Sequence, residues 1–266
     1  MKLRNKKVLL TGATGGIGRS IALALARQGA SLLLAGRNVV ALEQQKCAMA
    51  DSGVTIETVE LDLASERMVD QARNLLTRHP DIDVLINGAG VNHFLACDDL
   101  SVNQLSSIID INLKGTLLLT TAMLPALKQR PEAAIVNIGS TFGSIGYPGF
   151  SAYCASKFGV RGYSEALRRE LAATNVRVFY LAPRATQTSM NEPAVNAMNK
   201  ALGVAMDDPV WVSDQIVNAI ERNRFKLFLG WPERLFVVIN SLFSNVVDKA
   251  LIKQLPVIQS YLNKEA

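Results

Sequence analysis

The chain has 266 residues, of which 49% are hydrophobic and 19% charged, and its formal net charge is +5. This composition supports a large apolar core and excludes general disorder. The positive charge is spread along the chain without a Lys/Arg block, which argues against nucleic-acid binding. The three cysteines, Cys47, Cys97 and Cys154, have no CxxC spacing. We therefore predict neither disulfides nor a metal site, and we expect a reducing, cytoplasmic setting.

The first apolar run is followed by a glycine-rich turn and then by helical apolar spacing. We expect a buried strand at 7–10, a turn at 11–18 (TGATGGIG) and a helix at 17–28. Glycines let a backbone turn tightly and approach a pyrophosphate, which binds at the positive end of the helix. The spacing fits both Gly-x-x-x-Gly-x-Gly and Gly-x-x-Gly-x-x-Gly, so the turn predicts dinucleotide binding and leaves the subtype open.

The second expected strand, 31–35, ends just before Arg37, which lies 19 residues after Gly18. Dinucleotide folds that prefer NAD carry an acidic residue at about this distance, where it binds the ribose 2′-hydroxyl. A guanidinium instead suits a 2′-phosphate, which it can meet with paired hydrogen bonds. The sequence therefore favours NADP (NADPH) over NAD, although an exposed loop arginine is the plain alternative.

Strands and helices continue to alternate along the rest of the chain. We expect further strands at 54–59, 83–86, 133–138, 176–181 and 225–229, and helices at 39–50, 65–78, 100–127 and 151–173. This order predicts an α/β fold, a Rossmann-like doubly wound parallel sheet of about seven strands with helices on both faces. No linker or repeat interrupts it, so we treat 1–266 as one NAD(P)-binding oxidoreductase domain, with 230–266 as an apolar C-terminal helical extension.

Tyr153 and Lys157 are four residues apart at the start of the helix expected at 151–173, so they share one helix face. A free phenol titrates near pH ~10 and exchanges protons poorly at neutral pH. A cation beside it favours the phenolate and brings the pKa of the phenol toward the range that acid–base catalysis needs. Alone, the pair also fits a buried tyrosine next to a solvated lysine.

Taken together, the motifs resemble the short-chain dehydrogenase/reductase (SDR) family in its classical form, over roughly residues 6–188. The glycine turn is followed in the family's order and spacing by Asp62, the segment 87–90 (NGAG), Asn112, Ser140 and the Tyr153/Lys157 pair. The resemblance implies a catalytic set of Asn112, Ser140, Tyr153 and Lys157. It also implies cofactor contacts from Gly12, Thr14, Gly15, Gly16, Ile17, Gly18, Arg37, Asp62, Leu63, Asn87, Ala89, Gly90, Tyr153, Lys157, Pro183 and Thr188.

The resemblance also implies a role for each catalytic residue. Tyr153 would give or take the substrate proton, and Lys157 would lower the pKa of Tyr153 and hold the nicotinamide ribose. Ser140 would hydrogen-bond the substrate oxygen, and Asn112 would hold a water that relays protons to Lys157. An asparagine in an apolar helix is costly if it is buried unpaired, so we expect a partner for Asn112.

Among the cofactor contacts, Asp62 would accept a hydrogen bond from the adenine amine and Thr188 would bind the carboxamide. Asn87 would brace the sheet beside the cofactor.

Two positions depart from the family pattern. Gly88 stands where the family has a second asparagine, which removes one side-chain amide. Arg184 follows Pro183 where the family has glycine, and so places a cation near the pyrophosphate or the substrate entrance. Whether Arg184 aids NADP binding or selects an acidic substrate is left open.

Candidate substrate contacts follow the strand ends and suggest an apolar pocket; they are Phe94, Phe142, Ile145, Phe150 and Met190. The segment 190–206 has weak periodicity and is a candidate lid. The C-terminal helix opened by Trp231 is apolar over a wide arc. Subunit contact or core packing is the first interpretation, and a membrane-surface helix or a greasy entrance for a long-chain substrate is the second.

The leading functional hypothesis is an NADP(H)-dependent oxidoreductase that interconverts a ketone or aldehyde, hydrophobic or lipid-like, and an alcohol. A 3-oxoacyl-carrier reductase is the alternative within enzymes. A non-catalytic NADP(H)-binding regulator is the alternative outside them, although such a protein has no need of the proton-transfer groups. The resemblance further implies a homodimer or homotetramer through the helices at 100–127 and 151–173.

Overall fold

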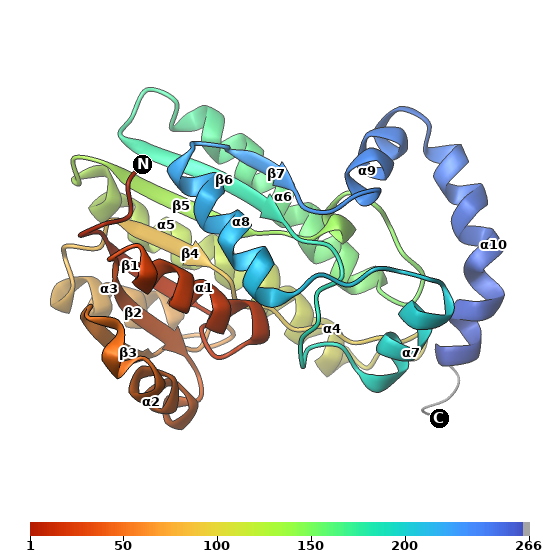
Figure 1. Cartoon of the computed structure of the whole chain (residues 1–266), viewed down its shortest axis with the longest axis horizontal. Helices are drawn as coiled ribbons and strands as arrows, with labels where there is room; N and C mark the ends of the chain where they lie inside the picture. The colour runs from red at the N-terminus through yellow and green to blue at the C-terminus, as the bar shows by residue number, and fades with distance from the viewer. Residues whose placement is uncertain (263–266) are drawn as a thin grey trace.

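The computed structural model describes residues 1–262 and contains a seven-stranded sheet whose neighbouring strands all pair in parallel. The strand order is β3-β2-β1-β4-β5-β6-β7 (Figure 1). The strands are β1 (Lys7–Thr11), β2 (Ser31–Gly36), β3 (Ile56–Glu60), β4 (Val84–Asn87), β5 (Ala133–Ile138), β6 (Val176–Ala182) and β7 (Lys226–Phe228). The predicted doubly wound α/β fold is confirmed.

Helices cover both faces of this sheet (Figure 1). One face packs mainly on α1 (Gly16–Arg27) and α8 (Pro209–Glu221), and the other on α3 (Met68–Arg78), α5 (Thr116–Lys128) and α6 (Ser151–Glu170). Because side chains alternate along a strand, Val8 and Leu10 join the first core and Leu9 joins the second. Strands covered on both faces read as continuous apolar runs, which is why β5 could be located from the sequence. The remaining helix beside the sheet is α2 (Val39–Ala48).

The long helix expected at 100–127 is present but is not regular throughout. It consists of α4 (Val102–Ile109), a π-helical segment at Asp110–Gly115 and α5. Within the described residues, Val102–Lys128 is long and apolar enough to cross a membrane by length and composition. It packs against α3 and α6, as a core helix does. The π-helical segment contains Asn112, and such segments often occur at functional sites.

The C-terminal part differs most from the prediction. The single helix expected after Trp231 is two helices, α9 (Glu233–Leu242) and α10 (Ser244–Leu262), which break at Phe243. The candidate lid segment contains a regular helix, α7 (Pro193–Ala201), and α8 was not predicted. The last four residues of the expected extension, 263–266, lie outside the described part.

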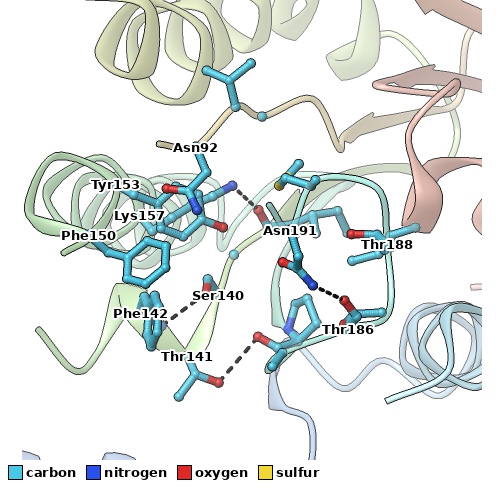
Figure 2. A pocket seen from close by; sticks show the side chains of 18 of the residues that line it. Asn92, Ser140, Thr141, Phe142, Phe150, Tyr153, Lys157, Thr186, Thr188 and Asn191 are labelled. Atoms are coloured by element: carbon cyan, nitrogen blue, oxygen red, sulfur yellow. Dashed lines mark hydrogen bonds between the residues drawn. The ribbon is translucent and has the colours of Figure 1, made fainter. Parts of the chain in front are cut away.

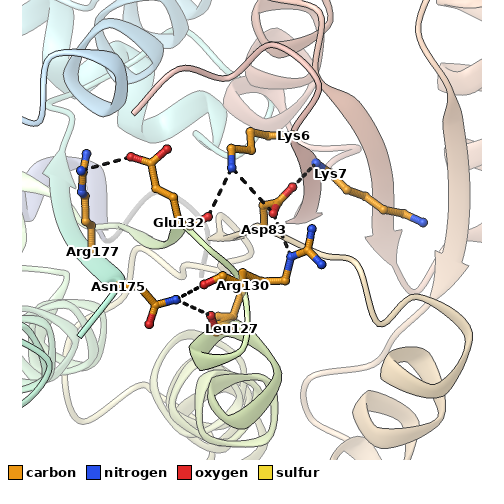
Figure 3. Close-up of polar contacts among 8 residues, drawn as sticks. All are labelled: Lys6, Lys7, Asp83, Leu127, Arg130, Glu132, Asn175 and Arg177. Atoms are coloured by element: carbon orange, nitrogen blue, oxygen red, sulfur yellow. Dashed lines mark hydrogen bonds and ion pairs between the residues drawn. The ribbon is translucent and has the colours of Figure 1, made fainter.

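A polar network occupies the edge of the sheet where the strands begin (Figure 3). At its centre is Asp83, a buried carboxylate directly before β4. It accepts hydrogen bonds from the Lys7 backbone N–H at 3.1 Å and from Arg130 Nε at 2.9 Å. Nearby, Arg177 pairs with Glu132 at 3.1 Å. This network joins the starts of β1, β4, β5 and β6, so its role is structural.

Asp83→Ala is expected to lower the free energy of unfolding by about 2–3 kcal/mol, because it leaves Arg130 and the Lys7 N–H without their buried acceptor. Urea unfolding followed by circular dichroism measures the change. Asp81→Ala is the matched control, since Asp81 pairs with Lys7 at 3.1 Å but is exposed. It should cost less than about 1 kcal/mol. Equal losses in the two variants would contradict a special role for Asp83.

Candidate active site

A large cavity of about 930 Å³ opens at the carboxyl ends of the strands. Its walls come from the segments that follow the strands β1 to β6, together with α6 (Ser151–Glu170), α7, α9 and α10. In open parallel sheets ligands bind at this edge, where the strand order reverses. The volume is near the upper end of the usual range of ligand sites, roughly 300–1,000 Å³.

The glycine turn forms the end of the cavity nearest β1. Gly12 has φ +70°, and a β-carbon there would lie 2.7 Å from the Ala89 backbone, so glycine is required for both conformation and space. Helix α1 begins at Gly16, and its N-cap, Gly15, offers no side-chain cap. The free N–H groups at this helix end therefore face a cavity that admits a phosphate group. These residues fit a dinucleotide pyrophosphate.

The other predicted cofactor contacts lie along the same cavity, with one exception. Arg37 is exposed at its rim just after β2 and has no ion pair within residues 1–262. The cavity is also lined by Thr14, Ile17, Gly18, Asp62, Leu63, Ala89, Gly90, Tyr153, Lys157, Pro183 and Thr188. The exception is Asn87, which is buried in β4 and lies outside the lining.

Asn87 belongs to a buried polar chain that crosses the sheet. Its Nδ2 donates to Thr120 Oγ1 at 3.0 Å and to Asn137 Oδ1 at 2.8 Å. Asn137 in turn donates to Ser164 Oγ at 2.8 Å. The chain joins β4 and β5 to α5 and α6, which gives Asn87 the position of a brace behind the cavity.

Tyr153, Lys157 and Ser140 meet in the middle of the cavity (Figure 2). Tyr153 and Lys157 come from the first turns of α6, and Lys157 Nζ lies 5.7 Å from the centre of the Tyr153 ring. The Lys157 ammonium donates to the Ile138 carbonyl at 3.0 Å, at the end of β5. The predicted sharing of one helix face by this pair is therefore present in the structure.

Burial shifts the pKa values of Tyr153 and Lys157. Burial raises the pKa of Tyr153 to about 12, and the contact with the Ser140 hydroxyl opposes this only in part. Phe142 lies edge-on to the Tyr153 ring, with the ring centroids 6.4 Å apart. Burial also lowers the pKa of Lys157, to about 8. Burial is the main influence on the pKa of Tyr153 in this structure, and the expected lowering of that pKa by Lys157 stays a prediction.

The position of Ser140 is fixed by close packing behind it. The Tyr180 hydroxyl donates to the Ser140 carbonyl at 3.2 Å. A β-carbon at either Gly139 or Gly143 would collide with the Tyr180 ring or hydroxyl. The Ser140 hydroxyl accepts from the Phe142 N–H at 3.1 Å and faces the cavity. Because Gly139 and Gly143 have no side chains, Tyr180 can pack against the backbone beside Ser140 and fix its position.

Asn112 is buried and, as expected, its side-chain amide has hydrogen-bond partners. It does not line the cavity. Its amide pairs with the backbone of Val91, accepting at 2.8 Å and donating at 2.9 Å, and also donates to Ser156 Oγ at 3.1 Å. A β-carbon at Gly90 would lie 3.4 Å from Asn112 Oδ1 and 3.6 Å from Lys157 Nζ. Asn112 thus holds the segment after β4 against α6, beside Lys157. Its expected role in water relay stays a prediction.

Four of the five predicted substrate contacts line the cavity, namely Phe142, Ile145, Phe150 and Met190. Phe94 does not, and that prediction is wrong. Its ring packs behind Phe150 at 4.9 Å and it is 2% exposed. The loop sequence did not indicate which of its apolar side chains would turn inward.

Sequence reasoning missed several lining residues. Asn92 lines the cavity, and its buried Oδ1 has no partner within residues 1–262. Others, which include much of the C-terminal wall, are for example Asn191, Val195, Met198, Asn199, Phe236, Ile239, Val246, Val247, Ala250, Leu251 and Gln254. Only the apolar spacing of the C-terminal segment hinted at such a role.

Arg184, which stands where the family pattern has glycine, takes part in a cluster of ion pairs. Its guanidinium makes two hydrogen bonds to Asp207, at 2.8 and 3.0 Å, and one to Glu233 at 2.8 Å. It also donates to the Trp231 carbonyl at 2.9 Å. Arg184 therefore connects the segment after β6 to the start of α9, where it holds the C-terminal wall. The expectation that its charge would be offered to a pyrophosphate or an acidic substrate does not fit these bonds.

Comparison with known proteins agrees with this geometry. A family model described as short chain dehydrogenase matches residues 6–199. Dehydrogenase/reductase SDR family member 7B from Mus musculus is 36% identical over 206 residues, covering 76% of this chain and 64% of the relative. The chain therefore matches less than two thirds of that relative's length.

Solved structures show the same fold. A short chain dehydrogenase/reductase from Burkholderia phymatum in complex with NAD has a TM-score of 0.82 at 22% identity, covering 92% of this chain and 96% of that one. A short-chain dehydrogenase from Sphingobium yanoikuyae in complex with NADPH has a TM-score of 0.77 at 25% identity, covering 93% and 95%.

The parallel sheet, the glycine turn at α1 and the Tyr153/Lys157 pair define a dinucleotide-dependent oxidoreductase of the Rossmann type. The chain belongs to the short-chain dehydrogenase family. It is an NAD(P)-dependent oxidoreductase of that family.

Proposed function

We propose that the protein is an NADPH-dependent reductase of an apolar ketone or aldehyde. The observation that carries the proposal is that the Tyr153 phenol, the Ser140 hydroxyl and the Lys157 ammonium lie together on a cavity that also contains the glycine turn. A protonated phenol is a proton donor, which is the group that carbonyl reduction requires. Bound NADPH would supply the hydride at the carbonyl carbon.

The surrounding residues support this direction of reaction. The Ser140 hydroxyl lies where it can donate to the carbonyl oxygen of a substrate held against Tyr153. When Tyr153 gives up its proton, the phenolate that forms is favoured by the nearby Lys157 ammonium. The aromatic side chains of Phe142 and Phe150 line the cavity beside the phenol and favour an apolar substrate.

A panel of alkyl ketones and aldehydes of increasing chain length, assayed with NADPH, tests the proposal. We expect kcat/KM to rise with chain length, because the far wall of the cavity is apolar. Higher activity on carrier-linked 3-oxoacyl substrates would favour the 3-oxoacyl-carrier alternative. NADPH binding without turnover of any substrate would instead favour a regulator.

Arg37→Asp is expected to reduce the preference for NADPH over NADH roughly 100-fold, because it removes a charge-assisted bond to the 2′-phosphate and adds repulsion. The ratio of kcat/KM values for the two cofactors measures this preference. Arg67→Asp is the control, since Arg67 is also exposed but lies outside the cavity lining. A ratio that does not respond to Arg37→Asp would rule out the NADP assignment.

A further inference from the structure

The two C-terminal helices expose apolar side chains to an unusual degree. They lie together at one end of the molecule, away from β1–β3 (Figure 1). At their junction, Val238, Leu242, Phe243 and Val246 form what we call the apolar tip, with Leu242 69% and Phe243 65% exposed. Trp231, Leu235 and Ile252 extend the exposed apolar surface from it. Contiguous exposed apolar patches mark interaction surfaces.

The tip is held in place rather than frayed. Glu233, at the start of α9, pairs with Arg184 at 2.8 Å. In the next two turns, Asn240 Nδ2 donates to the Ser144 carbonyl at 2.9 Å, and Val237 packs in a small core with Ile145. The exposed side chains are therefore presented outward by a helix that is fixed on its other side.

The cavity opens onto this same surface. Phe236 and Val246 line the cavity and are also 45% and 59% exposed, so each belongs both to the inner wall and to the outer patch. An apolar molecule bound in the cavity would therefore have apolar contacts that continue from the inner wall to the outer surface.

The charges beside the tip indicate what covers it. Arg234, Lys249 and Lys253 are exposed on α9 and α10, whereas Glu233 is already paired with Arg184 and Asp248 is the exposed acid between them. Protein–protein interfaces are depleted in lysine at their centres. Lysine and arginine interleaved with apolar side chains are instead typical of helices that lie on anionic lipid, where the long side chains reach the headgroups. Trp231 is also a residue type enriched at that boundary.

We propose that the apolar tip docks the protein on an anionic lipid bilayer, and that apolar carbonyl substrates enter the cavity directly from the bilayer. The docking stands on the exposed surface and its charges. The substrate part rests on the proposed function.

Vesicle flotation of the full chain tests the docking. Vesicles of phosphatidylcholine with about one third phosphatidylglycerol should bind the protein more strongly than phosphatidylcholine alone, and high salt should weaken the binding. The double variant Leu242→Asp/Phe243→Asp should lower the vesicle partition coefficient roughly 10- to 100-fold. The matched control is Val40→Asp/Val102→Asp, which changes two apolar residues of similar exposure, 69% and 78%, by the same charge and should bind as the unaltered protein does.

Two further measurements separate this proposal from its rivals. Tyr153→Phe should float like the unaltered protein, so a failure of the catalytic assignment leaves the docking result intact. Light scattering after size exclusion reports the oligomeric state. The proposal would be overturned if the unaltered protein does not bind anionic vesicles and the Leu242→Asp/Phe243→Asp variant dissociates to a lower oligomeric state. That result would identify the tip as a subunit contact.

Discussion

Tyr153→Phe is expected to lower kcat for carbonyl reduction by at least ~10³-fold, because the phenol is the group we assign as proton donor to the substrate oxygen and phenylalanine has no proton to give. The ring remains, so its contacts with Phe142 and the shape of the cavity are kept. NADPH affinity, measured by fluorescence titration, should therefore change by less than about threefold.

Tyr163→Phe is the matched control for this result. Tyr163 lies on the same helix, ten residues further along, and is half-buried outside the cavity lining. Loss of its hydroxyl should leave kcat within about threefold of the unaltered protein. If activity survives Tyr153→Phe, the phenol is not the proton donor. The proposed role of Ser140, as the donor to an oxygen held against that phenol, would then also be lost.

Lys157→Met is expected to lower kcat/KM by ~10²-fold or more and to change the pH dependence of what remains. Burial lowers the pKa of Lys157 to about 8, so its charge is present below that pH and is lost above it. Because the ammonium favours the phenolate that forms during proton donation, reduction should be constant below pH about 8 and fall above it. Tyr153 remains protonated through this range, with a pKa of about 12. The break in the profile therefore belongs to Lys157.

The test is a profile of log kcat/KM against pH between 6 and about 10 for both proteins. The break near pH 8 should vanish in Lys157→Met and persist in Lys128→Met, which removes an exposed lysine at the end of α5. Urea unfolding confirms that each variant is folded. A break that persists in Lys157→Met would assign the titration to another group.

Patterns of neighbouring residues predicted those strands and helices whose structure depends mainly on the local sequence. The bounds of β5 were found because five of its six residues are apolar, the exception being Asn137. The start of α6 was found because helical spacing begins at Ser151. The Tyr153/Lys157 pair needed only helix geometry. The start of α8 carried a readable signal that was missed, since Asp208 caps the helix and Pro209 occupies its first turn.

Features that depend on distant residues could not be predicted in the same way. The pKa of Tyr153 depends on how the folded chain buries it, and the role of Arg184 depends on Asp207 and Glu233, 23 and 49 residues away. Phe94 and Phe150 are both apolar loop residues, and only the packing decides which of them faces the cavity. The oligomeric state implied by the resemblance stays a prediction.

The Arg184 cluster restricts how this protein could acquire or lose its C-terminal wall. It contains two carboxylates and one guanidinium, all of them partly buried. If Arg184 is replaced first, by the glycine that the family pattern has, Asp207 and Glu233 are left without a cation. This change lowers the stability of the folded protein. Neutralising the two acids first would instead leave the partly buried guanidinium without its anions, which also costs stability. A change from this arginine to the glycine of the family pattern should therefore alter residues 184, 207 and 233 together.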